Sequence, residues 1–300
     1  MQTPFGECAV WDAHVHFFSR RFFDSLAAQA GKPSEAVAAS LGWDLPPEDP
    51  VELASRWAAE LDKHGVERAA LIASIPGDEA SVTAAAAARP NRFLAYAMVN
   101  PLADKPPVLA GLHGLCFFPA MHRYFMHDSR VEPLLEQAAA QGSLVFVHCG
   151  VLTVGVRKKL GLPSLFDMRY SNPIDLHAVA LRYPKLNFVL PHFGAGYFRE
   201  ALMLADLCPN VYLDTSSSNS WMKFEGLELK TVLRRALDVV GPTRLLLGTD
   251  SSFFPRGWNA TIFDQQTQCL TDLSVGSADA RRIFGENLRQ LLKPASQPPS

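Results

Sequence analysis

Short apolar segments recur along the chain, and a longer segment with helical periodicity follows most of them. Several of these segments are nearly continuous aliphatic runs, such as 144–147 and 245–247. A strand that is covered on both faces has such a continuous apolar sequence, whereas a half-exposed antiparallel strand alternates apolar and polar residues. The pattern therefore favours a parallel sheet. The eight predicted strands are Val10–His16, Arg68–Ser74, Phe93–Val99, Gly114–Phe118, Leu144–Cys149, Asn187–His192, Val211–Ser216 and Arg244–Asp250.

Helix-start signals lie between these strands. Asp49-Pro50 precedes a predicted helix over Val51–His64, and Asn172-Pro173 precedes one over Ile174–Arg182. Proline is favourable at the first helical position because its missing N–H would be unpaired there in any case. Eight repeats of strand and helix most simply close as a (β/α)₈ TIM barrel of the α/β class. An open doubly wound sheet is the alternative.

Residues 17–50 interrupt the alternation after the first strand. This insertion contains Phe18, Phe22 and Trp43, and the pattern leaves open whether it forms a lid over the barrel mouth or a surface loop. Residues 293–300 are typical of a flexible tail. Because no linker-like segment divides the rest, we expect a single barrel domain over residues 1–292.

Composition restricts the classes of partner. Lys and Arg number 28 against 30 Asp and Glu, which gives a net charge of −2 and argues against nucleic acid. The longest apolar stretch, 144–156, is shorter than the roughly 20 residues of a membrane span. The partner that we expect is a small-molecule substrate, and a homo-oligomer is left open.

The cysteines and the N-terminal sequence bear on localisation. The five cysteines are scattered and form no C-x-x-C motif, which favours a reducing compartment. The first 18 residues show no basic segment followed by an apolar one, so we expect no signal peptide. Together these features predict a cytoplasmic protein.

Ligand-type side chains gather at the ends of the predicted strands. His14 and His16 are two residues apart and therefore leave the same face of the first strand. His148, His192 and Asp250 end three other strands. In a barrel all five lie at the carboxyl ends of strands, where catalytic sites are built. One such histidine would be weak evidence, but the coincidence of five predicts a metal site suited to Zn²⁺, with Mn²⁺ or Fe²⁺ as alternatives.

Four further side chains are candidates for substrate contacts. Arg157 and Arg169 follow the fifth strand and could bind a substrate carboxylate through paired N–H donors, although a solvated basic loop is the alternative. Phe254 and Trp258 follow the eighth strand and could form an apolar or aromatic wall, or merely part of a turn.

Four motifs in the chain resemble the amidohydrolase superfamily. More narrowly, they resemble its amidohydrolase-related branch, which includes aminocarboxymuconate-semialdehyde decarboxylase and other metal-dependent hydrolases and decarboxylases. The resemblance extends from about Val10 to Leu292. The motifs are Asp12-Ala-His14-Val-His16, Val147-His148-Cys-Gly150, Leu190-Pro-His192-Phe-Gly-Ala-Gly196 and Leu247-Gly-Thr-Asp250-Ser.

This resemblance implies roles for the strand-end residues. His14, His16, His148 and Asp250 would bind one divalent metal ion, with water completing its shell. His192 would lie near that water as general base or as an outer partner. Asp250 would both contact the ion and relay the proton, because a bound metal lowers the pKa of water toward neutrality.

The chain departs from the family pattern around the fourth strand, and this limits the residue roles that the resemblance implies. Two-metal members bridge their ions with a carboxylated lysine on the fourth strand, where this chain has Cys116, so we expect one ion. Relatives in the narrower branch carry a lysine followed by a histidine around this strand, at the approximate places of Cys116 and Phe118. Asp214 ends the seventh strand and could bond a metal-bound group, orient His192 or cap a loop.

The expected function is therefore that of a metal-dependent hydrolase. Metal-activated water would attack the carbonyl of an amide, ester or lactone in a small substrate, which would be acidic if the arginines bind it. The alternative is a nonoxidative decarboxylase of a small unsaturated or aromatic acid, in which the metal and His192 deliver a proton to carbon. A metal-free binding barrel is disfavoured because every ligand type is present. The fold alone does not separate the first two.

Overall fold

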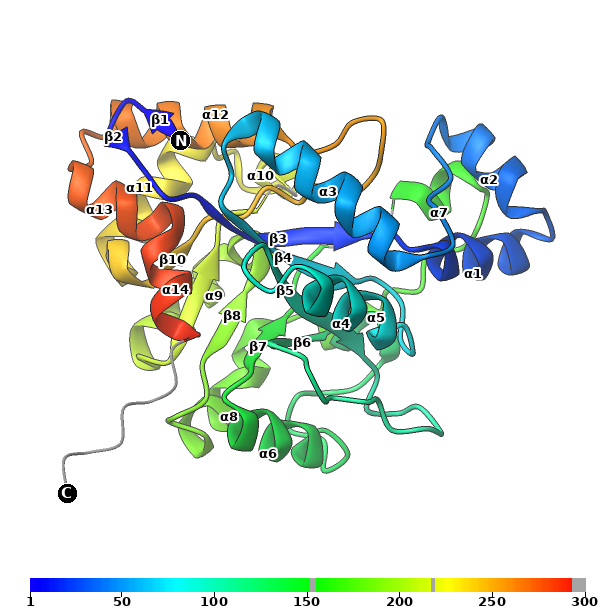
Figure 1. Cartoon of the computed structure of the whole chain (residues 1–300). Helices are drawn as coiled ribbons and strands as arrows, with labels where there is room; N and C mark the ends of the chain where they lie inside the picture. Colours follow the sequence, from blue (N-terminus) through cyan, green and yellow to red (C-terminus); the bar gives the residue numbers. More distant parts are fainter. Residues whose placement is uncertain (152–154, 217–218, 293–300) are drawn as a thin grey trace, which may run out of the picture.

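Eight parallel strands form one sheet in the order β10-β9-β8-β7-β6-β5-β4-β3 (Figure 1). The computed structural model describes residues 1–151, 155–216 and 219–292. Every strand predicted from the sequence is present, and the α/β barrel prediction is confirmed. The strands are β3 (Trp11–Phe17), β4 (Arg68–Ala73), β5 (Phe93–Val99), β6 (Gly114–Phe117), β7 (Leu144–Val147), β8 (Phe188–Leu190), β9 (Val211–Asp214) and β10 (Leu245–Leu246).

The two edges of this sheet meet beside β3. Ala13 N donates to Leu247 O at 2.8 Å, and Asp250 N donates to His14 O at 3.0 Å. A further bond joins His16 N to Ser251 O at 2.7 Å. These bonds satisfy the polar backbone groups that an open sheet would leave at its edges. They close the barrel and bring the ends of β3 and β10 together, so the doubly wound alternative is excluded.

The helices form an outer layer around the sheet (Figure 1). The core accordingly has two parts: one lies between sheet and helices, and the other fills the barrel with side chains such as Tyr96, Cys116 and Phe146. The α-helices are α1 (Arg20–Ala30), α2 (Ser34–Leu41), α3 (Pro50–His64), α4 (Glu79–Ala88), α5 (Pro119–His122), α6 (Glu132–Gln141), α7 (Gly155–Lys159), α8 (His177–Arg182), α9 (Phe198–Leu207), α10 (Met222–Glu225), α11 (Leu229–Val240), α12 (Ala260–Asp272), α13 (Ser277–Arg281) and α14 (Asn287–Leu291).

Local sequence explains where several elements begin and end. The Asp49 side chain accepts a bond from Val51 N, so it caps α3 as predicted. The predicted helix over Ile174–Arg182 begins as a 3₁₀ turn (η2, Pro173–Leu176) before α8. Strand β8 is shorter than predicted because Pro191 has no N–H for the ladder and because a 3₁₀ turn (η3, Pro191–Gly194) follows.

The insertion after the first strand folds into α1 and α2. In Figure 1 these helices lie beside α7, beyond the carboxyl ends of the strands. They share a small apolar cluster of Phe22, Phe23, Leu26, Val37 and Leu41 with Val156 of α7. The insertion is therefore anchored over one side of the barrel mouth. Whether it opens and closes as a lid stays a prediction.

One feature of the described residues precedes the barrel. It is a two-stranded antiparallel hairpin, β1 (Gln2–Thr3) and β2 (Gly6–Glu7), which was not predicted.

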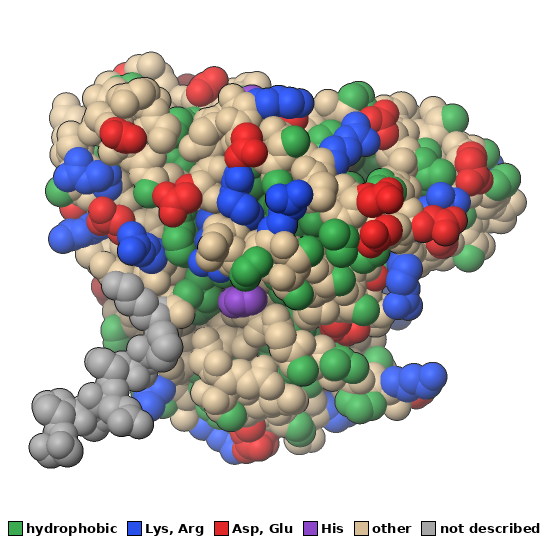
Figure 2. Space-filling view, viewed as in Figure 1, with side chains coloured by type: hydrophobic (Ala, Val, Ile, Leu, Met, Phe, Trp, Pro, Cys, Tyr) green, Lys and Arg blue, Asp and Glu red, His purple; other side chains and the backbone are tan. Residues whose placement is uncertain are grey.

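Acidic and basic side chains are interspersed over the face drawn in Figure 2. Of the helices in the described part of the chain, none is long and apolar enough to cross a bilayer. The predicted tail, 293–300, lies outside the described residues, and the domain boundary at 292 stays a prediction.

Candidate metal centre and cavity

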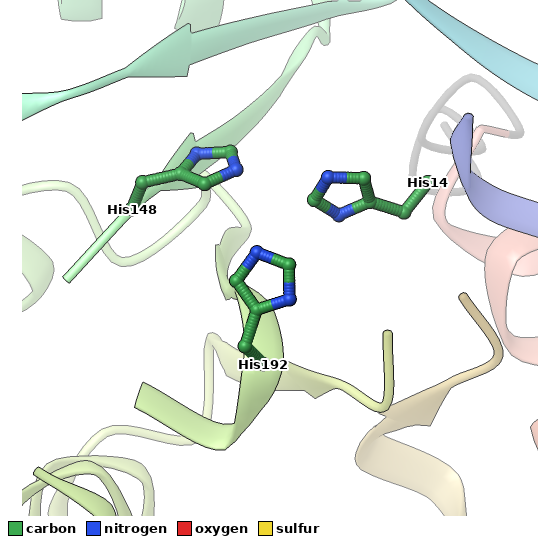
Figure 3. Close-up of side chains that lie close together, drawn as sticks. All are labelled: His14, His148 and His192. Atoms are coloured by element: carbon green, nitrogen blue, oxygen red, sulfur yellow. The ribbon is translucent and has the colours of Figure 1, made fainter. Parts of the chain in front are cut away.

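The barrel brings all five strand-end residues together. His14 and His16 project from β3, His148 follows β7, His192 lies in η3 after β8, and Asp250 follows β10. Figure 3 shows the rings of His14, His148 and His192 converging from three elements. Their ring centroids are 5.0 to 5.6 Å apart.

Two overlapping groups of these side chains have metal-site geometry. His14, His148 and His192 form one, and His14, His16 and Asp250 form the other, with ligand atoms within 4.8 Å of one another in each. His16 Nε2 lies 3.2 Å from Asp250 Oδ1, and His14 Nε2 lies 3.9 Å from the same oxygen. Because His14 belongs to both groups, they are parts of one centre. His192 is as close to that centre as His148, so the geometry alone does not separate base from ligand.

Unpartnered nitrogen atoms mark the middle of this centre. His14 Nε2 and both ring nitrogens of His148 are buried without a hydrogen-bond partner within the described chain. Leaving a buried polar atom unsatisfied costs about 1–3 kcal/mol, and native proteins rarely do so without a reason. Imidazole nitrogens are ligands for zinc and similar divalent ions. The residues present therefore fit a divalent cation.

Outer hydrogen bonds orient three of the four histidines. His14 Nδ1 lies 2.6 Å from Asp214 Oδ2, which leaves Nε2 facing the centre. His16 Nδ1 lies 2.7 Å from Ser74 Oγ. His192 Nδ1 lies 2.9 Å from Ser216 Oγ. Partners of this kind fix the ring orientation of metal-binding histidines.

The position of Asp214 corrects one of the sequence hypotheses. Its carboxylate is fully buried and contacts His14, not His192. Gly248 makes this approach possible, because a Cβ atom there would lie 2.4 Å from Asp214 Oδ1 and 3.0 Å from His14 Cβ. The outer partner of His192 is Ser216, which no sequence motif indicated.

The surroundings of the centre favour neutral forms of His148 and His192 and the ionised form of Asp250. Burial, assisted by repulsion from His14, holds the pKa of His148 well below its usual range. Burial also lowers the pKa of His192. Burial alone would raise the pKa of Asp250, but the bond from His16 and the nearby imidazole charges lower it to about 2. The lowered pKa values of His148 and His192 favour neutral imidazoles, which beside the ionised carboxylate of Asp250 can serve as donors to a cation.

Two of these residues have strained backbones. His192 has φ of 56° and Asp250 also has φ of 56°, in the left-handed region that residues with a side chain rarely adopt. Such conformations cost about 1–3 kcal/mol and cluster at functional sites. The strain directs both side chains into the centre at the point where their strands end.

A cavity of about 510 Å³ opens above the centre. His16, His148, His192 and Asp250 line its base. Its walls are mainly apolar and come from the insertion, β5 and the segments that follow the strands. These wall residues include Phe18, Phe22, Trp43, Met98, Phe118, Met121, His122, Val156 and Phe166. The centre thus lies at the bottom of an aromatic-lined pocket.

Arg157 is the one predicted substrate contact that the structure places in this cavity wall. Its side chain is buried, and its Nη1 donates to Gln29 Oε1 of the insertion at 2.7 Å. Its Nε donates to Pro163 O at 2.9 Å. These bonds fix the guanidinium between α7 and α1, where it contributes positive charge, together with Lys159, to a mainly apolar wall.

The other three predicted substrate contacts lie outside this cavity. Arg169 pairs with its neighbour Asp167, and its side chain is 77% exposed. Phe254 packs on Trp57, with 4.8 Å between the ring centroids. Trp258 is buried and donates its indole N–H to Asp12 Oδ2 at 2.8 Å. Arg169 thus forms an exposed ion pair, and Phe254 and Trp258 pack inside the protein, so nothing in this geometry supports their predicted roles in substrate binding.

Several residues of the site were not predicted from the sequence. Ser74 and Ser216 follow strands without a distinctive motif, and only their place in the barrel identifies them as histidine partners. Phe118 was noted as a departure from the family pattern, but its contact with His148 was not predicted. Met121 was not predicted either, and it lines the cavity from α5 together with His122.

Comparisons with known proteins agree with this architecture. A family model described as "Amidohydrolase" matches residues 11–293. Among curated proteins, "Protein fluG" of Emericella nidulans is 42% identical over 141 residues, which is 43% of this chain. That match spans only 16% of the length of the relative.

Solved structures show the same fold at low sequence identity. An amidohydrolase from Burkholderia multivorans with bound zinc is 15% identical (TM-score 0.61; 95% of this chain and 99% of that chain covered). A 5-carboxyvanillate decarboxylase from Novosphingobium aromaticivorans complexed with manganese is 14% identical (TM-score 0.61; 96% and 96%). A probable 2-pyrone-4,6-dicarboxylic acid hydrolase from Acinetobacter baumannii is 13% identical (TM-score 0.59; 94% and 98%).

Proposed function

This chain belongs to the amidohydrolase family, which is a family of enzymes, and from that premise we propose that it is a metal-dependent hydrolase of small substrates. The observation that supports the proposal best is the set of buried, unpartnered imidazole nitrogens at the base of the cavity. His14, His16, His148 and Asp250 would hold one divalent ion. We propose Zn²⁺, with Mn²⁺ or Fe²⁺ as alternatives, since related folds bind zinc or manganese.

The bound ion would activate water and polarise the carbonyl group of an amide, ester or lactone. The residues of the chain then supply proton transfer. Because Ser216 engages His192 Nδ1, Nε2 is the atom of His192 that remains to accept a proton from the attacking water. The carboxylate of Asp250, which faces the same space, would relay that proton to the leaving group.

The cavity supports a small substrate with an apolar or aromatic body and an acidic group. Phe18, Phe118 and Phe166 would contact the flat body, while Arg157 would attract the acid. The probable hydrolase of similar fold is named for a pyrone dicarboxylic acid, and a pyrone is a flat lactone of this kind. A lactone dicarboxylate is therefore the first hydrolysis substrate to assay.

The second candidate function is nonoxidative decarboxylation of an aromatic acid. The aromatic lining of the cavity favours it, and a 5-carboxyvanillate decarboxylase shares the fold. In that case His192 Nε2 would deliver a proton to the ring carbon as CO₂ leaves. Incubating the metal-loaded protein anaerobically with both substrate types separates the two, since release of CO₂ indicates the lyase and a new carboxylate without CO₂ indicates the hydrolase.

A pair of variants tests the division of roles at the centre. His148→Ala should lose the ion, because a ligand is removed. His192→Asn should keep the metal but lose about 10²–10⁴-fold in rate, the usual contribution of a general acid or base. Metal analysis and one turnover assay on both variants are sufficient. A metal-free His192→Asn protein would show that His192 is a ligand and would transfer the proton role to Asp250.

A further inference from the structure

His148 is held differently from the other three histidines of the centre. Those three each have one ring nitrogen beside a side-chain oxygen, as described above. Neither ring nitrogen of His148 has a partner within the described residues. Its backbone N–H is bonded to Phe117 O at 2.9 Å, which fixes the main chain but not the ring.

The ring of Phe118 lies directly against that of His148. The two centroids are 3.8 Å apart and the planes are inclined by only 15°. Phe118 follows β6, the strand that pairs with β7 in front of His148, so the contact is set by the register of two neighbouring strands. Phe118 is itself only 6% exposed, which restricts its own movement.

We propose that Phe118 is the positioning residue of His148. The face of the Phe118 ring fixes the orientation of this imidazole, as a hydrogen-bond partner does for the other three histidines. The terminal torsion of a histidine side chain is broad, so an imidazole without a partner samples many ring orientations. A flat ring at 3.8 Å restricts it to one plane. His148 then presents a nitrogen to the centre without a further entropy cost on metal binding.

The proposal rests on the ligand role of His148 proposed above. It differs from the simpler reading that Phe118 only forms a cavity wall. A wall residue would change substrate affinity and leave metal affinity unchanged. A positioning residue would change metal affinity in the absence of any substrate. Zinc affinity of the substrate-free protein therefore distinguishes the two roles.

The experiment compares Phe118→Leu, Phe118→Tyr and wild type. Zinc dissociation constants are measured by competition with a chromophoric chelator, and the cobalt-substituted proteins are compared by visible absorption. We expect Phe118→Leu to bind zinc about 3- to 10-fold more weakly, in the range of about 0.5–1.5 kcal/mol for one aromatic pair. Its cobalt spectrum should shift, whereas Phe118→Tyr keeps the flat ring and should restore both properties.

Phe166→Leu is the matched control, since Phe166 lines the same cavity from another loop. Its zinc affinity should equal that of wild type. Wild-type zinc affinity and cobalt spectrum in Phe118→Leu would overturn the proposal, and Phe118→Met repeats the comparison if the leucine variant does not fold. His148→Ala distinguishes failure of the ligand role from failure of the positioning role. If His148→Ala retains zinc, the ligand assignment fails. If it loses zinc while Phe118→Leu binds zinc with wild-type affinity, only the positioning role fails.

Discussion

At the scale of single residues, the contact between Asp214 and His14 has the clearest consequence. We predict that Asp214→Asn weakens metal binding by about 10- to 100-fold, the usual loss when the outer partner of a ligand is changed. The carboxylate also raises the pKa of His14 against the lowering effect of burial. Asp175→Asn is the control, because Asp175 pairs with His127 on an outer loop. Equal metal affinity in both variants, measured by chelator competition, would contradict the prediction.

His122 makes a second prediction possible at this scale. Burial lowers its pKa from 6.5 to about 4. As pH falls below 6.5 the unfolded chain binds a proton that the folded protein takes up only near pH 4, so stability is lost across this window. The loss is at most about 1.4 kcal/mol per pH unit.

The measurement for His122 is denaturant unfolding of wild type and His122→Asn between pH 4 and pH 7.5. The difference in unfolding free energy between the two proteins should be constant above pH 6.5 and should move in favour of the variant below it. Other titrating groups contribute equally to both curves and cancel. A difference that does not change with pH would show that folding does not lower the pKa of His122.

The sequence identified the strand-end histidines and Asp250 but not their neighbours, for a physical reason. A ligand at a strand end is visible as a polar residue that interrupts an apolar run. The partner of His14 comes from residue 214, two hundred positions away along the chain. Only closure of the barrel brings that carboxylate to this ring and leaves Ser216 for His192. Pairings of this kind depend on register, which periodicity does not specify.

At the scale of elements, the insertion and the loop after β7 meet at Arg157. We predict that Arg157→Ala raises KM for acidic substrates ten-fold or more, about 1.4 kcal/mol, and affects neutral analogues little. Gln29→Ala should shift KM in the same direction by less, because it removes one bond that fixes the guanidinium. Arg169→Ala is the control, since Arg169 forms an exposed pair outside the cavity. Equal effects of Arg157→Ala on acidic and neutral substrates would reject the role.

The elements themselves were predictable to different degrees. Each strand core was visible as an apolar run because both faces of a barrel strand are covered. The strand ends were not predictable in this way. The last strand, which was predicted to reach Asp250, ends at Leu246, and individual backbone hydrogen bonds join the segment after it to β3. The helices of the insertion were not predicted, since residues 17–50 carry aromatic residues and prolines as well as helical periodicity.

At the scale of the whole molecule, the barrel gathers one centre from strands that lie far apart in the sequence, and this bears on the number of ions that we propose. His14 Nδ1 is engaged by Asp214, so His14 offers only Nε2 to both groups of ligands. A lysine that could bridge a second ion is absent from β6, where Cys116 is buried inside the barrel. Both observations support the proposal of a single ion for each chain.

We therefore predict one tightly bound divalent ion per chain and a folded state that depends on it. A ligand that binds only the folded protein stabilises it by about 2.7 kcal/mol when its free concentration is 100 times its dissociation constant. Removal of the ion by a chelator should lower Tm, because the nitrogens of His14 and His148 are again buried without partners, and readdition of zinc should restore it. His148→Ala should show little change in Tm on either treatment. Elemental analysis that finds two tightly held ions, or an equal Tm with and without metal, would contradict the single-centre interpretation.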